Sequence, residues 1–149
     1  MEMSVLVQFK DLGMAAAVSL AAVGSAFGTG AAGMAAIGAW KKCYAQSKTA
    51  PFLLLAFVGA PLTQIIYGMI LMGKISEAAA GGNFFWGTGI LGGLAMGASA
   101  MMQGKAGAKA CDALAETGKG FGNYIMVLGV IETVALFVMV FTMTALPKM

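Results

Sequence analysis

Glu132 is the residue whose type and setting most clearly suggest chemistry, because it is a carboxylate inside a long apolar stretch. The five residues before it read VLGVI and the five after it read TVALF. A charged side chain at the centre of a bilayer costs about 2.5–3.5 kcal/mol on insertion scales, and such residues are functional by default. We therefore predict that Glu132 carries a cation. The alternative is a permanently neutral carboxyl that only packs.

A polar stripe on another apolar stretch would lie opposite Glu132. Its members stand at positions i, i+3, i+4 and i+7, on one face of a helix, and are Ala60, Thr63, Gln64 and Tyr67. Pro61 within the stripe has no N–H, so it frees carbonyl groups in the preceding turn. Gln103, in a further stretch, adds a second amide.

Together these residues provide a nearly complete set of oxygen ligands. The oxygens belong to a carboxylate, two amides, a hydroxyl and a backbone carbonyl, on Glu132, Gln64, Gln103, Thr63 and Ala60. Hard cations prefer such ligands, whereas a proton needs only the carboxyl and one hydrogen-bond partner. The set therefore predicts a metal cation, with sodium as the leading candidate. If the amides instead hydrogen-bond each other or the carboxylate, the site carries a proton.

The composition requires lipid as the surrounding medium. Of the 149 residues, 60% are hydrophobic and 10% are charged, whereas soluble domains carry about 25% charged residues. All the basic residues are lysines, and a protein that reads nucleic acid would normally use arginine. The chain has no histidine, the commonest general base, and no phosphate-binding loop. We therefore predict a membrane protein that binds no nucleic acid and is not catalytic alone.

Four stretches are long enough to span a bilayer, which takes about 20 apolar residues. They cover residues 12–40, 51–73, 84–110 and 122–145. Charged residues and glycines separate them, including Lys74 and Glu77 before the third stretch and Asp112 and Glu116 before the fourth. This spacing predicts an all-α membrane protein built as two helical hairpins, residues 1–76 and residues 77–149, with the glutamate in the second.

The two hairpins place both hairpin loops on one side of the membrane, and the termini and the middle connection on the other. Six lysines lie on or near the loop side, and Lys10, Lys74 and Lys148 lie on the other. The excess of lysine near the loops places them in the cytoplasm. Cys43 and Cys111 form neither a CxxC nor a zinc pattern and are expected to be reduced thiols. Residues 1–11 lack the apolar core of a signal peptide.

The first and third stretches are rich in small residues spaced four apart. These are Gly24, Gly28, Ala32 and Ala36 in the first stretch and Gly89, Gly93 and Gly97 in the third. Such spacing puts the small residues on one helix face and allows the backbones to approach closely. The second and fourth stretches are bulkier. Two concentric layers would give the small-residue helices close helix neighbours and allow the bulkier helices to face lipid. An ordinary four-helix bundle is the alternative.

Short segments in all four stretches carry a family resemblance. They are GSAFGTG at 24–30, PLTQIIYG at 61–68, QGK at 103–105 and VIET at 130–133. In this order they resemble the duplicated proteolipid, the c or K subunit, of V-type and archaeal-type rotary ATPases. Each segment alone is weak evidence, but the combination is specific and covers the whole chain.

The resemblance implies a two-layered ring of identical subunits, with the small-residue helices inside. In sodium-dependent members the ion ligands match Glu132, Gln64, Gln103, Thr63 and the carbonyl of Ala60. Tyr67 matches the tyrosine that hydrogen-bonds the carboxylate and locks the loaded site. The resemblance also implies a stator membrane subunit that supplies an arginine, central-stalk subunits, and a prokaryotic plasma membrane. Gln64 takes the place in the first hairpin that Glu132 takes in the second, so one ion per subunit is expected.

Two other classes of protein are alternatives to this interpretation. A small secondary transporter also uses an intramembrane glutamate, but it usually surrounds an organic cation with aromatic side chains, and here only Tyr67 is aromatic. A structural tetraspan protein would be favoured by long loops outside the membrane or by paired cysteines. The sequence has neither feature.

Overall fold

A computed structural model describes residues 12–147, and the regular elements in this range are all helices. They are α2 (Leu12–Ala45), α3 (Leu54–Gly59), the 3-10 helix η1 (Ala60–Leu62), α4 (Thr63–Ala79), α5 (Trp86–Thr117) and α6 (Phe121–Thr144). Because α3, η1 and α4 follow one another without a gap, they form one rod with a tightened turn at Pro61. The predicted all-α membrane fold is confirmed, as four helical rods in two hairpins.

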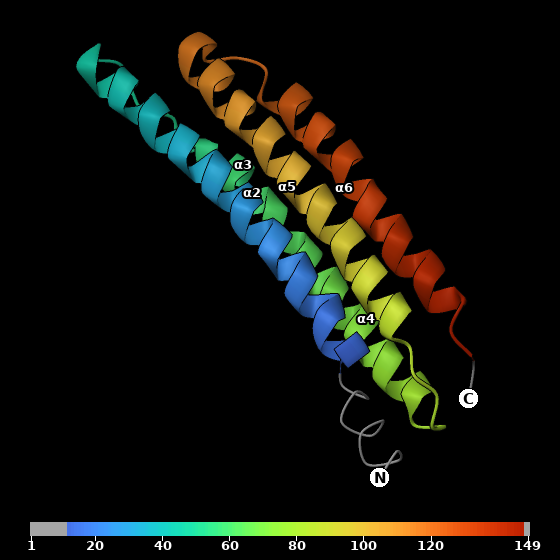
Figure 1. Cartoon of the computed structure of the whole chain (residues 1–149). Coiled ribbons are helices and arrows are strands. Elements are labelled where there is room, and N and C mark those ends of the chain that lie inside the picture. The colour runs from blue at the N-terminus through green and yellow to red at the C-terminus, as the bar shows by residue number, and fades with distance from the viewer. Residues whose placement is uncertain (1–11, 148–149) are drawn as a thin grey trace.

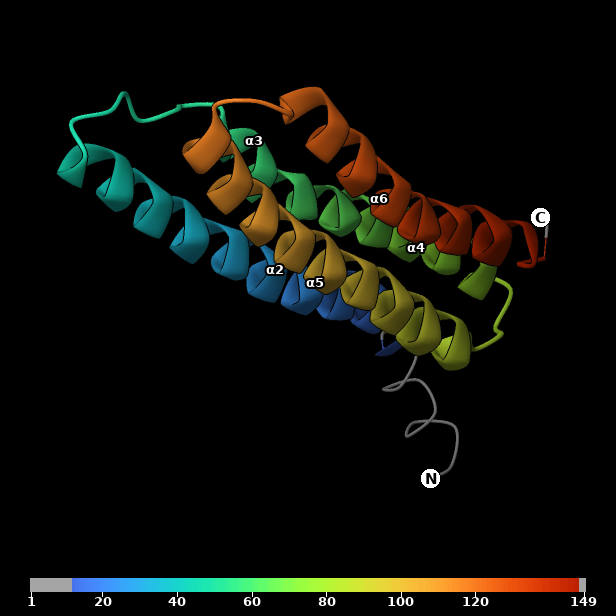
Figure 2. The same ribbon diagram turned by 90° about the horizontal axis from the view of Figure 1, so that it is seen from above.

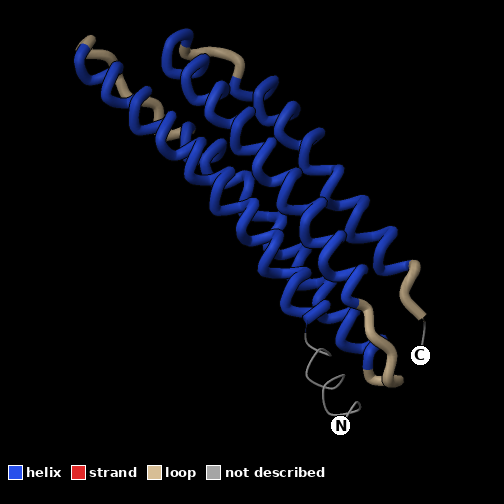
Figure 3. The backbone as a smooth tube through the Cα atoms, in the orientation of Figure 1, coloured by secondary structure: helices blue, strands red, loops and turns tan. Residues whose placement is uncertain are grey.

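The rods run nearly parallel to one another (Figure 1). The α2–α3 and α5–α6 connections lie at one end of the bundle. The start of α2, the end of α6 and the α4–α5 connection lie at the other end, and the loops are drawn in tan in Figure 3. This is the arrangement of loops that the two-hairpin prediction requires. Lys10, Lys148 and residues 1–11, which entered the predictions of orientation and targeting, lie outside the described residues.

Three helices continue beyond the apolar stretches that predicted them. The predicted ends near residues 40, 73 and 110 are wrong, because the helices end at Ala45, Ala79 and Thr117. Residues such as Lys42, Lys74 and Glu116 end the apolar stretch, but lysine and glutamate are good helix formers and do not end the helix. The division after residue 76 consequently lies within the last turns of α4, and residues 80–85 connect the hairpins.

The bundle has two layers, which Figure 2 shows with α2 beside α5 on one side and α4 beside α6 on the other. The most extensive helix contact is between α2 and α5. Small residues make it possible: a Cβ atom added to Gly24 would overlap the backbone of Gly97, and one added to Gly93 would lie 2.5 Å from the carbonyl oxygen of Ala16. The close packing predicted for the two small-residue faces is therefore present within one chain.

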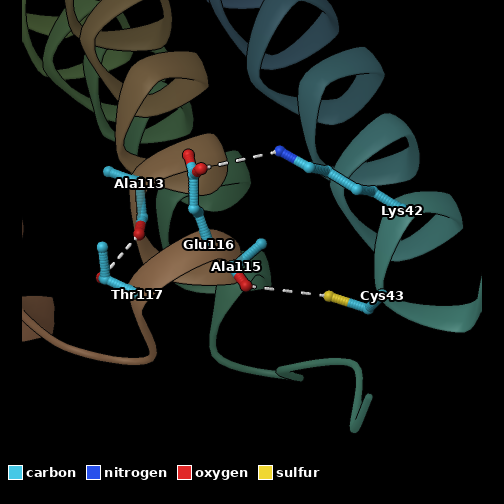
Figure 4. Close-up of polar contacts among 6 residues, drawn as sticks. All are labelled: Lys42, Cys43, Ala113, Ala115, Glu116 and Thr117. Carbon is cyan, nitrogen blue, oxygen red and sulfur yellow. Dashed lines mark hydrogen bonds and ion pairs between the residues drawn. The ribbon is translucent and has the colours of Figure 1, made fainter. Parts of the chain in front are cut away.

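At the loop end of the bundle, α2 and α5 make two polar contacts (Figure 4). Lys42 Nζ and Glu116 Oε1 lie 4.0 Å apart, both largely exposed, and the Cys43 thiol lies 3.9 Å from the carbonyl oxygen of Ala115. An exposed ion pair of this kind stabilises by about 0–1 kcal/mol. The α5–α6 turn uses Gly118 and Gly120 at φ angles of 67° and 90°, which favour glycine because it has no Cβ.

Three rods in the described chain are long and apolar enough to cross a membrane: α2, the α3–η1–α4 rod (Leu54–Ala79) and α6. α5 is less apolar because glycines, two lysines and Gln103 lower its hydropathy, and it is the helix that contacts all the others. The 34 residues of α2 span about 51 Å at the α-helical rise, more than a hydrocarbon core of about 30 Å. Of these three rods α6 is the most exposed, because only 11% of its most apolar 18-residue segment is buried.

Candidate functional site

Glu132 lies on α6 with its carboxylate turned toward the other helices. The Tyr67 hydroxyl, on α4, donates a hydrogen bond to Glu132 Oε1 at 2.7 Å. The Gln103 amide, on α5, donates to Glu132 Oε2 at 3.3 Å. Each carboxylate oxygen therefore accepts a hydrogen bond from a different helix.

Gln64 and Gln103 lie side by side behind the carboxylate, and both are fully buried. Gln64 Nε2 donates to Gln103 Oε1 at 2.8 Å. Gln103 Nε2 also donates to the carbonyl oxygen of Leu128 at 3.0 Å. Buried amides must be hydrogen-bonded to offset their desolvation, and here each amide satisfies part of the other's requirement.

The turn at Pro61 brings the remaining predicted ligands to the same place. Thr63 Oγ1 lies 3.1 Å from the carbonyl oxygen of Ala60 and 3.2 Å from Gln64 Oε1. Pro61 is buried, and a Cβ added to Gly28 would lie 3.0 Å from the Pro61 Cβ, so glycine allows α2 to approach this turn. The missing N–H of proline explains why the helix tightens here.

The predicted site residues therefore form one continuous network. It runs from Ala60 through Thr63, Gln64 and Gln103 to Glu132, with Tyr67 on the opposite side of the carboxylate. The hydrogen bond between the two amides is the contact that sequence reasoning gave as the alternative to ion ligation. A terminal amide group can adopt two orientations that exchange its oxygen and nitrogen, and its hydrogen-bond partners determine which one it takes. Rotation of the Gln103 amide would replace its hydrogen bonds to the Leu128 carbonyl and the carboxylate with an oxygen facing both acceptors, an arrangement that a bound cation would stabilise.

Sequence reasoning missed Ser99. Its side chain is buried on α5, and its hydroxyl donates to the carbonyl oxygen of Ile131, the residue before Glu132, at 2.9 Å. Ser99 stands one helical turn before Gln103, so both side chains lie on one face of α5. That spacing of four was visible in the sequence, but nothing indicated which helix this face would contact.

The charge at the site is a single carboxylate. Among the described residues the ion pairs are Lys42–Glu116 and Lys74–Glu77, and neither includes Glu132. No group of three or more His, Cys, Asp or Glu side chains is placed to hold a metal in that part of the chain. One proton or one monovalent cation is enough to neutralise the carboxylate of Glu132.

Comparison with known families finds a match on the second hairpin. Residues 86–145 match the family of the ATP synthase C subunit. The matched segment covers the whole of α5 and α6 and includes Ser99, Gln103 and Glu132. The comparison with curated proteins finds no match. Over this segment the chain is therefore similar to a proteolipid c subunit of a rotary ATPase.

Proposed function

We propose that this chain is a rotor-ring subunit of a V-type or archaeal-type rotary ATPase and carries one sodium ion per subunit on Glu132. The match of residues 86–145 to the ATP synthase C subunit supports the coarser part, an ion-translocating member of a ring. The finer part rests on the number of neutral polar side chains, those of Thr63, Gln64 and Gln103, gathered beside a single intramembrane carboxylate.

The cycle depends on the charge of the site. An empty, ionised Glu132 enters lipid only at high cost, whereas a loaded site is neutral and moves through lipid. The α6 face around Glu132 suits that movement because Val130, Val134 and Phe137 are exposed and apolar. Unloading needs a positive group in trans, because this chain contains no arginine. We assign that role to a stator membrane subunit that supplies an arginine.

Sodium is favoured over a proton by the number of neutral polar side chains linked to the carboxylate. A proton site needs one carboxyl and one hydrogen-bond partner, and Tyr67 already provides that partner. Two buried amides and a hydroxyl beside it are more than a proton requires, and hard cations use such neutral oxygens as ligands. The direct hydrogen bond between Gln64 and Gln103 is the observation that favours the alternative, in which the same ring transports protons.

The assignment to the duplicated V-type or archaeal-type proteolipid is based on the number of hairpins. The family match covers one hairpin, and the chain contains two, with Gln64 on the first hairpin and Glu132 on the second. One ion for four rods follows from this division. The chain is not catalytic alone, and hydrolysis or synthesis of ATP belongs to the soluble headpiece, linked to the ring by central-stalk subunits. We place the ring in a prokaryotic plasma membrane with the hairpin loops in the cytoplasm.

The decisive experiment is labelling of Glu132 with a carbodiimide in purified membranes, with and without sodium. Carbodiimides attack the protonated carboxyl, so a bound ion that occupies the carboxylate slows the reaction. We expect sodium to protect Glu132 at moderately alkaline pH, with potassium at equal ionic strength as the control. If only pH alters labelling, the ring transports protons. The exposed Glu77 is the internal control, since sodium should not change its reactivity.

A further inference from the structure

The backbone of α6 is hydrogen-bonded to α5 at two points beside Glu132. Ser99 Oγ donates to the Ile131 carbonyl oxygen at 2.9 Å, and Gln103 Nε2 donates to the Leu128 carbonyl oxygen at 3.0 Å. In an α-helix the Leu128 carbonyl is the acceptor for the N–H of Glu132. The two contacts therefore lie on the turn that carries the carboxylate.

Apolar packing of α6 is concentrated on either side of Glu132, where Ile125 and Val138 lie against the two core clusters. Its buried residues are Leu128 and Ala135, and the exposed apolar side chains on the rest of the helix provide no hydrophobic drive toward one orientation in lipid. Helices in lipid associate through packing and interhelical hydrogen bonds. Hydrogen bonds near Glu132 therefore act together with this packing to set the orientation of α6 about its own axis.

The Ser99 hydroxyl does not hydrogen-bond to a carbonyl of its own helix, although such bonds are common. Helical Ser and Thr hydroxyls commonly bond to a carbonyl three or four residues earlier. Thr117 does so with Ala113 at 2.7 Å, and Thr133 does so with Val130 at 2.7 Å. Ser99 instead crosses to another helix. A carbonyl oxygen has two lone pairs, so Ile131 accepts this bond in addition to its helical one.

We propose that Ser99 is a positioning residue for the ion site. Together with Gln103 it fixes the rotation of α6 so that Glu132 faces Tyr67, and loading and release then occur by movement of the Glu132 side chain while the helix backbone stays in place. This inference rests on the proposed function only in that Glu132 carries the ion. The backbone contact itself can be tested without any ion.

The test combines one spectroscopic signal with sodium protection, on the assembled protein in membranes. Ile131–Glu132 is the one place in the sequence where isoleucine precedes glutamate. Labelling with carbonyl-¹³C isoleucine and ¹⁵N glutamate therefore isolates the Ile131 carbonyl in solid-state NMR. We expect Ser99→Ala to shift this carbonyl resonance and to raise the sodium concentration for half-protection roughly twofold to tenfold, as loss of one net hydrogen bond implies. Ser99→Thr, which keeps the hydroxyl, should restore both values.

Ser25→Ala is the matched control. Ser25 is a fully buried helical serine on α2 whose hydroxyl has no hydrogen-bond partner. Its removal should leave the Ile131 resonance and the protection by sodium unchanged. An unchanged Ile131 resonance in Ser99→Ala, or equal changes in both alanine variants, would overturn the positioning role. If sodium protects neither the parent protein nor the variants, the sodium assignment fails, and the Ile131 resonance still decides the role of Ser99.

Discussion

Tyr67 and Glu132 lie on different hairpins, 65 positions apart in the sequence, and their side chains meet at 2.7 Å between the phenol oxygen and Oε1. The contact joins α4 to α6 within the layer that these two helices form. It holds the carboxylate against the amides and away from the exposed apolar face of α6. Movement of Glu132 toward lipid would break this bond, so we propose that Tyr67 is a latch on the site.

Replacing Glu132 with glutamine tests the carrier. Glutamine keeps the size and polarity of the side chain but removes the titratable and ion-pairing group. We expect Glu132→Gln to abolish ion transport and ion-coupled ATP hydrolysis while the ring still assembles, as measured in reconstituted vesicles and by native mass spectrometry. Transport that persists in this variant would remove Glu132 from the mechanism.

Removal of the Tyr67 hydroxyl tests the latch. Tyr67→Phe keeps the ring of the side chain and loses the hydrogen bond to Glu132, so the loaded state should be less stable. We expect the sodium concentration for half-protection to rise roughly twofold to tenfold, with a faster carbodiimide reaction in the absence of sodium. Tyr44→Phe, at an exposed position on α2, should behave like the parent. Identical labelling in the two variants would show that the hydroxyl does not hold the carboxylate.

The two buried amides should distinguish sodium from protons. Gln64→Leu and Gln103→Leu preserve much of the side-chain volume but remove an oxygen that a cation needs and a proton does not. We expect each to weaken protection by sodium by about tenfold or more, the scale of a lost hydrogen bond to a charged group, with a smaller change in the pH dependence of labelling. Gln46→Leu, in the α2–α3 connection, is the control. A sodium response equal to that of the parent would place the amides outside the ligand set.

The close approach of α2 and α5 predicts a difference between two glycines on the same helix. A Cβ at Gly24 would overlap the Gly97 backbone, whereas one at Gly38 would meet nothing within 4 Å. Backbone atoms cannot move aside as a flexible side chain can, so Gly24→Ala should destabilise the bundle. Gly38→Ala should be neutral or stabilising by up to about 1 kcal/mol from helix propensity. Thermal unfolding in detergent measures both, and equal melting temperatures would contradict this packing.

The helix ends show one limit of reasoning from hydropathy. α2, α4 and α5 end at Ala45, Ala79 and Thr117, beyond the apolar stretches. Hydropathy reports which residues prefer lipid, whereas the end of a helix depends on local propensity and capping, such as the positive φ of Gly118 after α5. Helices that extend past the membrane therefore have their ends in polar sequence.

The sequence by itself determined that the chain is a helical membrane protein with one intramembrane carboxylate, and that Thr63, Gln64 and Tyr67 share a helix face. Helical periodicity is enough for that, because it places residues around a single axis. Only the tertiary structure decided that Gln64 bonds Gln103, that Tyr67 reaches Glu132, and that Ser99 reaches Ile131. Those contacts depend on the depth and rotation of one helix relative to another. Packing between helices sets both, as the glycine contact of α2 with α5 illustrates. The sequence pattern of either helix alone therefore does not reveal them.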